Sequence, residues 1–398
     1  MMISVKTQEN IAWILLGGLL LLITFVKAHI FYNYYAWTKL LYPVCIGLGF
    51  SLVSFFGFRL IGLKGRYGFL LLCIGETLLY FHFHIAASSQ QGFLRLPWQG
   101  VVYSEMANIM QYDPTISKFN NVLGYQFRNS VSGKFANIEF NTKIETNSRG
   151  LRDDEESLIK PQIIALGDSY TAGWGVESQE RFSEILEDRA NLKILNGGVS
   201  SFGTVREGLL LKQLDLDSCK MIIIQYCMND YLENKTWLHQ IENGRTFEPS
   251  FNKEMYARRV KGNLTLRNYT PFRYIHVYTL TLARRLFSRN FTLPKVGNND
   301  IPEHTELFIR GLKQIRKAYK NRILVISLSN SYKRLDPAFT KELATQLSTS
   351  NLTNIDVLET SHLFEKEDVF YLDTHINEKG HAKVGKALFD YLQLNPLE

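Results

Sequence analysis

Hydrophobic residues are concentrated in three long runs near the beginning of the sequence. The runs cover Ile11–Val26, Leu40–Phe58 and Tyr67–Ile85, and each one is apolar all round a helix. Buried core helices are the alternative, but three such runs so close together are typical of membrane spans. The pattern therefore predicts a membrane region over residues 1–86 with three transmembrane helices.

Beyond Lys160 the pattern changes, because short apolar runs alternate with stretches of helical periodicity. This alternation predicts a parallel sheet with helices on both faces. We expect residues 161–398 to form a three-layer α/β/α sandwich with a mostly parallel, flavodoxin-like sheet, giving an α/β fold class. The expected strands are Ile163–Leu166, Leu192–Leu195, Met221–Tyr226, Ile323–Leu328 and Ile355–Leu358, and the expected helices lie near Arg181–Asp188, Val205–Leu214, Glu303–Tyr319, Pro337–Leu347 and Glu378–Leu392.

Two segments interrupt this organisation. Residues 87–160 are mostly polar and are expected to form a linker, near Ser88–Gly92, and a small β-containing lead-in. Within the lead-in, Phe135–Ile144 alternates apolar and polar residues in places, as a half-exposed strand does. Residues 231–302 interrupt the α/β alternation and are predicted to be an insertion.

The insertion carries the positive charge of the protein. From Phe251 to Asn299 there are ten Lys or Arg residues against Glu254 alone, whereas the whole chain has a net charge of +7. Nucleic acid is an improbable partner for an extracytoplasmic domain that carries no recognisable binding motif. The remaining interpretations are contact with anionic lipid headgroups, a cleft wall that gathers an acidic glycan, and a solvated face on a helical cap.

The charges beside the apolar runs predict the orientation in the membrane. Arg59, Lys64 and Arg66 lie between the second and third runs without an acidic residue, so this loop is expected to face the cytoplasm. The segment after Ile85 would then be extracytoplasmic, which means periplasmic in a Gram-negative bacterium. Glu76 lies inside the third run, where a polar contact between helices or with a partner protein is as good an explanation as a substrate path.

Candidate catalytic residues follow the first three expected strands. Gly167-Asp168-Ser169 comes after the first strand, Asn196–Thr204 after the second, and Asn229-Asp230 after the third. The carboxyl ends of parallel strands share one sheet edge, where active sites of open α/β sheets gather. The first turn lacks the glycine spacing of a nucleotide-binding loop.

Together these segments resemble the SGNH/GDSL hydrolase superfamily of serine esterases and O-acyltransferases. The similarity extends roughly from Asp113 to the C-terminus, and Asn147–Arg152 is similar to the segment that precedes the catalytic domain in membrane-anchored bacterial members. Three positions depart from the family pattern: Cys227 replaces a glycine, Ser201 replaces another, and Asp-x-x-His is shortened to Asp373-x-His375. The four ordered blocks are Gly167–Thr171, Asn196–Thr204, Asn229-Asp230 and Asp373–Asn377.

The resemblance implies a catalytic triad of Ser169 as nucleophile, His375 as base and Asp373 as the orienting acid. The implied oxyanion hole consists of the Ser169 amide, the amide of Ser201 or Gly203, and the side chain of Asn229. His381 is the second candidate for the base, although packing on the last helix is the better interpretation. The implied mechanism involves neither metal nor organic cofactor.

The sequence thus predicts a membrane-anchored, extracytoplasmic serine esterase that acts on O-acyl groups, chiefly O-acetyl groups, of a cell-envelope glycan. One alternative is an O-acyltransferase, whose acyl donor a membrane partner protein would supply. The other is a catalytically inactive glycan-binding or scaffold protein. The lipid bilayer and an acylated glycan are the expected partners.

Overall fold

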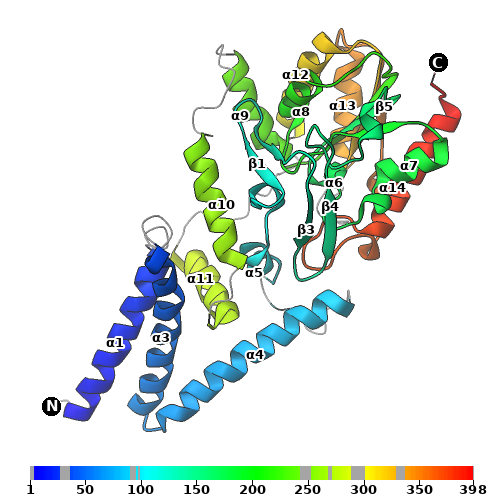
Figure 1. Ribbon diagram of the computed structural model, residues 1–398. Helices are drawn as coiled ribbons and strands as arrows, with labels where there is room; N and C mark the ends of the chain where they lie inside the picture. Colours follow the sequence, from blue (N-terminus) through cyan, green and yellow to red (C-terminus); the bar gives the residue numbers. More distant parts are fainter. Residues whose placement is uncertain are drawn as a thin grey trace. The chain divides into compact units, whose positions relative to one another are not determined.

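The computed structural model describes residues 4–26, 36–89, 96, 99–242, 252–267, 271–287, 301–328 and 337–397 (Figure 1). The chain divides into two compact units. The first comprises Met1–Ala107 and Lys261–Leu293, and the second comprises Asn108–Val260 and Pro294–Glu398.

The first unit contains three helices that are long and apolar enough to cross a membrane, in agreement with the three predicted spans. They are α1 (Val5–Val26), α3 (Ala36–Leu60) and α4 (Gly65–Ser89). All three extend beyond the apolar runs that predicted them, and Ser88 and Ser89 of the predicted linker form the end of α4. The rest of that linker, 90–92, lies outside the described residues.

Two further helices belong to the first unit, α5 (Gln99–Met106) and α11 (Arg273–Phe287). Helix α11 comes from the basic insertion and packs on α4, where Tyr274 stacks on Phe83 with ring centroids 5.3 Å apart. The Glu76 carboxylate accepts the amides of Tyr274 and Ile275, both at 3.0 Å. Glu76 therefore satisfies backbone donors that the first turn of α11 cannot pair within the helix.

The second unit is built on a parallel five-stranded sheet with the order β6-β5-β7-β8-β9. This is the flavodoxin-like order, so the predicted fold class is confirmed. The strands are β5 (Ile163–Leu166), β6 (Ile194–Asn196), β7 (Met221–Tyr226), β8 (Arg322–Ser327) and β9 (Ile355–Leu358).

Side chains alternate between the two faces of the sheet and form two apolar cores. Ile164 and Ile222 face the core under α8, α12 and α13, whereas Ile163 and Ile223 face the core under α7 and α14 (Figure 1). Central strands buried on both faces explain the continuous apolar runs in the sequence. The covering helices are α7 (Phe182–Ala190), α8 (Thr204–Leu211), α12 (Ile301–Ala318), α13 (Ala338–Ser348) and α14 (Glu378–Leu394).

Two other helices occupy the predicted insertion. Helix α9 (Asp230–Glu242) packs Trp237 and Leu238 against Val205 of α8 and Leu307 of α12, so it is part of the α/β body. Helix α10 (Lys253–Arg267) begins in the second unit, where Tyr256 joins the core.

The lead-in segment contains two antiparallel hairpins instead of one half-exposed strand. These are β1 (Ser117–Asn120) with β2 (Gly124–Phe127), and β3 (Ser132–Ala136) with β4 (Asn141–Glu145). The prediction of a strand over Phe135–Ile144 was wrong, because the chain reverses between Ala136 and Asn141. Phe135, Phe140 and Ile144 share a core with Trp174, which makes this hairpin part of the second unit.

Candidate active site

Ser169 lies directly after the first strand of the sheet, on a turn that requires a glycine. A Cβ atom at Gly167 would lie 2.2 Å from the Thr171 hydroxyl and 2.5 Å from the Gln225 side-chain oxygen. Asp168 caps the short helix α6 (Ser169–Ala172) by accepting the Tyr170 amide at 3.0 Å. The Gly-Asp-Ser sequence therefore ends the strand and places Ser169 at the first position of a helix.

Three residues far apart in the sequence meet at this position. Ser169 Oγ lies 2.9 Å from His375 Nε2, and His375 Nδ1 bonds Asp373 Oδ1 on its other side. A histidine that donates from Nδ1 to a carboxylate leaves Nε2 free to accept the serine proton. The structure thus brings together the predicted nucleophile, base and acid.

Two aromatic rings hold the His375 imidazole. Trp174 stacks on it with ring centroids 4.8 Å apart and planes 14° from parallel, and the Tyr170 ring lies 5.0 Å away. The Asp373 side chain is 4% exposed and the His375 side chain 19% exposed, so the carboxylate is buried whereas the imidazole is partly accessible.

The backbone explains how the shortened Asp373-x-His375 spacing still forms the pair. Thr374 has φ = +69°, a left-handed conformation that reverses the chain within one residue. Around it, the Phe370 amide donates to the His375 carbonyl at 2.8 Å, and the Thr374 amide donates to the Phe370 carbonyl at 3.1 Å.

The predicted oxyanion loop follows β6 and carries a second left-handed residue. Ser201, where the family has a glycine, has φ = +60°. Gln111 of the lead-in donates to the Ser201 hydroxyl and accepts from the Ser200 hydroxyl, both at 2.9 Å, and Arg206 bonds the Ser201 carbonyl. These contacts fix a backbone conformation that a glycine would adopt at lower cost.

The other predicted oxyanion donors also lie at the carboxyl ends of the strands. Asn229 Nδ2 donates to Asp168 Oδ2 at 3.1 Å, and an amide nitrogen carries a second hydrogen for another acceptor. Burial raises the pKa of Asp168, against hydrogen bonds from the Tyr170 amide and Asn229 that lower it. Gly203 is the N-cap residue of α8, and a Cβ there would lie 2.8 Å from the Asn234 side-chain oxygen.

Arg152, the last residue of the Asn147–Arg152 motif, binds the backbone of the segment that follows Ser169. Its guanidinium donates to the carbonyls of Ala172, Gly173 and Val176, which follow Ser169, and to that of Lys143. Because this guanidinium is fully buried and lies near Arg181, its pKa falls to about 9. The motif thus ties the lead-in to the segment that carries Ser169.

Two residues singled out in the sequence are not in the triad. His381, the second candidate base, is fully buried in α14 and its Nδ1 accepts the Phe182 amide at 3.3 Å. Cys227 follows β7 and is buried, and its amide donates to Asp230 at 3.0 Å. Burial raises the pKa of this thiol, so Cys227 is a packing residue under the Asn229 turn.

Sequence reasoning missed three residues of the site: Gln111, Glu139 and Trp174. The first two reach it from the lead-in, 90 residues from Ser201 and 234 from Asp373. No local spacing encodes such contacts. Trp174 lies three residues beyond the first motif, Gly167–Thr171, and its position five residues after Ser169 was the available signal.

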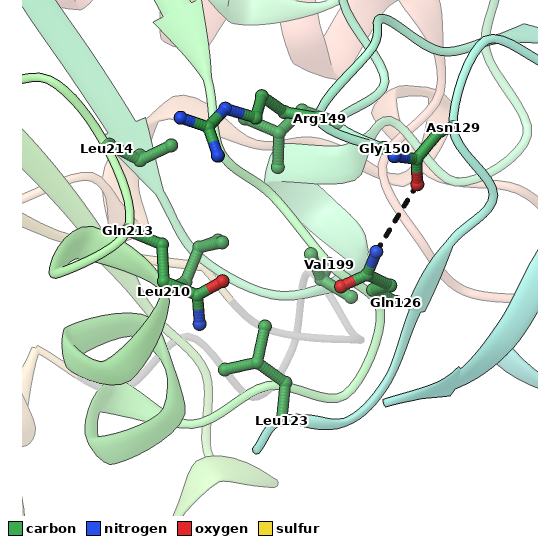
Figure 2. A pocket seen from close by; sticks show the side chains of 10 residues that line it. Leu123, Gln126, Asn129, Arg149, Gly150, Val199, Leu210, Gln213 and Leu214 are labelled. Carbon is green, nitrogen blue, oxygen red and sulfur yellow. Dashed lines mark hydrogen bonds between the residues drawn. The ribbon is translucent and has the colours of Figure 1, made fainter. Parts of the chain in front are cut away.

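A separate pocket lies beside the oxyanion loop (Figure 2). Its volume is about 140 Å³, and Val199 contributes to it from that loop. Gln126, Arg149 and Gln213 supply polar side chains, and no triad residue lines it.

Neither a family model nor a curated protein sequence matches this chain. Among solved structures, it is similar to a carbohydrate esterase, with a TM-score of 0.36, 14% identity, and 60% of this chain and 66% of that one covered. It is also similar to a putative lipolytic protein of the G-D-S-L family from Desulfitobacterium hafniense DCB-2, with a TM-score of 0.33, 11% identity, and coverage of 57% and 97%. A third similar structure is the acetyl xylan esterase Est2A from Butyrivibrio proteoclasticus, with a TM-score of 0.34, 13% identity, and coverage of 58% and 63%. The chain therefore spans slightly less than two thirds of the length of these carbohydrate esterases.

Proposed function

We propose that this protein is a membrane-anchored, extracytoplasmic serine esterase of the SGNH type, acting on O-acyl groups, chiefly O-acetyl groups, of a cell-envelope glycan. The observation that carries the proposal is the 2.9 Å contact between Ser169 Oγ and His375 Nε2, with Asp373 on the opposite ring nitrogen. A binding protein with an inactive site has no need of this alignment.

The geometry supports acyl transfer through a covalent intermediate. Ser169 Oγ attacks the ester carbonyl while His375 Nε2 takes the hydroxyl proton, and Asp373 stabilises the imidazolium. Collapse of the tetrahedral intermediate expels the sugar alkoxide, which receives the proton from His375. A water molecule then attacks the acyl-enzyme by the same proton route and releases the carboxylic acid.

Negative charge on the carbonyl oxygen would meet donors at the ends of three strands. The Ser169 amide, the Ser201 or Gly203 amide and the free hydrogen of Asn229 Nδ2 are the proposed donors. Loss of one such donor typically costs about 10²–10³ in kcat.

Replacing the nucleophile tests the proposal. We expect the full-length protein in detergent to hydrolyse p-nitrophenyl acetate, and Ser169→Ala to lower kcat at least about 10³-fold because the acyl-enzyme cannot form. Ser178→Ala, on a nearby turn outside the site, is the matched control and should keep wild-type turnover. Equal turnover by the Ser169→Ala variant and the wild type would refute the triad.

The same acyl-enzyme would serve an O-acyltransferase, in which a sugar hydroxyl replaces water. Adding a glycan acceptor to the acylated protein separates the two. If the acceptor speeds the loss of the acyl group from Ser169 and an acylated glycan appears, both measured by mass spectrometry, the reaction is a transfer. If the acceptor leaves the rate of deacylation unchanged and free acetate is the product, the reaction is hydrolysis.

A further inference from the structure

We propose that Glu139, in the turn of the β3–β4 hairpin, is a positioning residue for the triad acid. Its carboxylate binds the backbone of the loop that carries Asp373 and His375 and so holds Asp373 against the imidazole. The inference rests on the proposed function, because it assigns Glu139 a part in the chemistry of that triad.

The contact is made by a single oxygen atom. Glu139 Oε2 accepts the amide of Leu372 at 2.9 Å and the amide of Asp373 at 2.6 Å. Two successive amides that point at one carboxylate form an anion-binding nest, and charge-assisted bonds of this kind are stronger than neutral ones. The other oxygen, Oε1, is buried and makes no hydrogen bond within the described residues. Within the described residues, the hydrogen bonds of this carboxylate therefore all go to the loop that carries Asp373.

The loop needs an outside acceptor because of its shape. With one residue between acid and base, the chain reverses at Thr374, a β-branched residue with φ = +69°. Such residues rarely adopt this conformation unless neighbouring contacts impose it. Bonds inside the loop, from Phe370 to His375 and from Thr374 to Phe370, satisfy its inner amides. The amides of Leu372 and Asp373 are paired with Glu139, which fixes the peptide next to the triad carboxylate.

The hairpin that carries Glu139 is itself rigidly held. Phe140, the next residue, packs on Trp174 and on Phe370 at the start of the triad loop, with ring centroids 6.5 Å and 5.2 Å away. Trp174 in turn stacks on His375. The hairpin thus packs on the ring that stacks on the base, and its Glu139 carboxylate binds the loop that carries the acid.

The charge of Glu139 provides a signature beyond simple structural support. Burial, and to a smaller degree the negative charge of Asp373, raise its pKa to about 7, against the amides of Leu372, Asp373 and Tyr371, which lower it. The carboxylate is therefore neutral below this pH and charged above it. A Gln side chain reproduces the neutral form at every pH.

The test compares Glu139→Ala and Glu139→Gln with Glu177→Gln, using full-length protein in detergent. Glu177 is the matched control, because its carboxylate accepts the Lys143 amide elsewhere on the same hairpin. We expect Glu139→Ala to lower kcat for p-nitrophenyl acetate roughly 10- to 100-fold with KM unchanged, and to speed hydrogen exchange in the peptide covering residues 369–376. Glu177→Gln should change neither quantity.

Glu139→Gln keeps an acceptor oxygen and should recover most of the activity. We expect its kcat to equal the wild-type value near pH 5.5 and to fall roughly threefold below it above pH 8, where wild-type Glu139 is charged. This pH-dependent ratio gives a readout that does not require the alanine variant to fold. A ratio of one at all pH values, together with unchanged hydrogen exchange in residues 369–376, would overturn the inference. If the wild type shows no esterase activity but hydrogen exchange in residues 369–376 is faster in the variants, the proposed function is wrong, whereas the structural role of Glu139 in fixing the loop is supported. An active wild type with unchanged exchange and kcat in both variants refutes the role of Glu139 alone.

Discussion

His375 and His381 lie six positions apart in the sequence and have opposite environments. His375, the proposed general base, is partly exposed and bonds the Asp373 carboxylate. His381 is enclosed between α7 and α14, where its ring stacks on Phe182. Burial and the nearby positive charges of Arg181, Arg152 and His375 lower its pKa to about 3. It remains neutral in the folded protein over most of the acidic range.

This difference predicts acid-sensitive stability. In the unfolded chain His381 takes up a proton below pH 6.5, whereas in the folded protein it stays neutral down to about pH 3. The contribution of the neutral His381 to the free energy of unfolding is therefore fully present above pH 6.5 and decreases as the pH falls below that value. At pH 5 the loss amounts to about 2 kcal/mol. We expect His381→Gln to flatten the decline of the melting temperature between pH 7 and pH 5. His362→Gln, at an exposed histidine paired with Glu359, should leave the slope as it is; an identical slope in the His381 variant would contradict the assignment.

Residues whose roles are local could be predicted from the sequence, and residues that act at a distance could not. Ser169 and Asn229 stand in motifs directly after predicted strands, so strand order places both at one edge of the sheet. His375 was identified by its motif beside the start of the last helix. In the sequence, Glu139 is one of several polar residues in a segment that was predicted to be half-exposed, and nothing distinguishes it from the others. Its partners are backbone amides of a loop near the C-terminus, and because every residue except proline carries such an amide, no residue type in the sequence marks them as partners.

Among the elements, the buried strands were the easiest to predict. Three of the five, β5, β7 and β9, have the predicted bounds. The central strands β5 and β7 are buried along their whole length and almost entirely apolar, whereas the edge strand β9 is half-buried and includes Asp356. The lead-in hairpins were harder. Their strands have four or five residues, and the reversal between Ala136 and Asn141 contains neither glycine nor proline, so it lacked the usual turn signal.

Helix α11 is held by a residue of α4, one of the three candidate membrane spans. Glu76 was expected to make a polar contact between helices or with a partner, and it accepts the first amides of α11. We predict that Glu76→Ala lowers the stability of this unit by about 1–2 kcal/mol, the usual cost of losing a helix cap. Faster tryptic cleavage at Arg284 and Arg285, measured in nanodiscs, would report the loosened helix.

Two variants sharpen this prediction. Glu76→Gln keeps an acceptor and should be milder than Glu76→Ala. Thr77→Ala, one residue along α4, removes a hydroxyl that donates to the Cys73 carbonyl within the same helix and should behave as wild type. Cleavage at the wild-type rate in Glu76→Ala would show that packing on Phe83 alone positions α11.

On the scale of the whole molecule, the basic insertion does not form a cap of its own. Residues Lys261–Leu293 cluster with the N-terminal apolar helices, whereas α9 and the start of α10 belong to the α/β unit. Part of the positive charge thus lies in the unit that contains the candidate membrane spans.

The orientation of the spans decides whether the triad can reach an envelope glycan. Arg59 ends α3, and Lys64 and Arg66 flank the start of α4, so the turn between these helices carries positive charge without an acid. We predict that this turn is cytoplasmic and that the α/β unit is exported. With the native cysteines replaced, a single cysteine at Gly62 should resist a membrane-impermeant maleimide in intact cells, and one at the exposed Asp215 should react. Alkaline phosphatase fused after Glu398 should be active. Labelling of position 62 in intact cells, together with an inactive fusion, would place the triad in the cytoplasm and exclude an envelope glycan as its substrate.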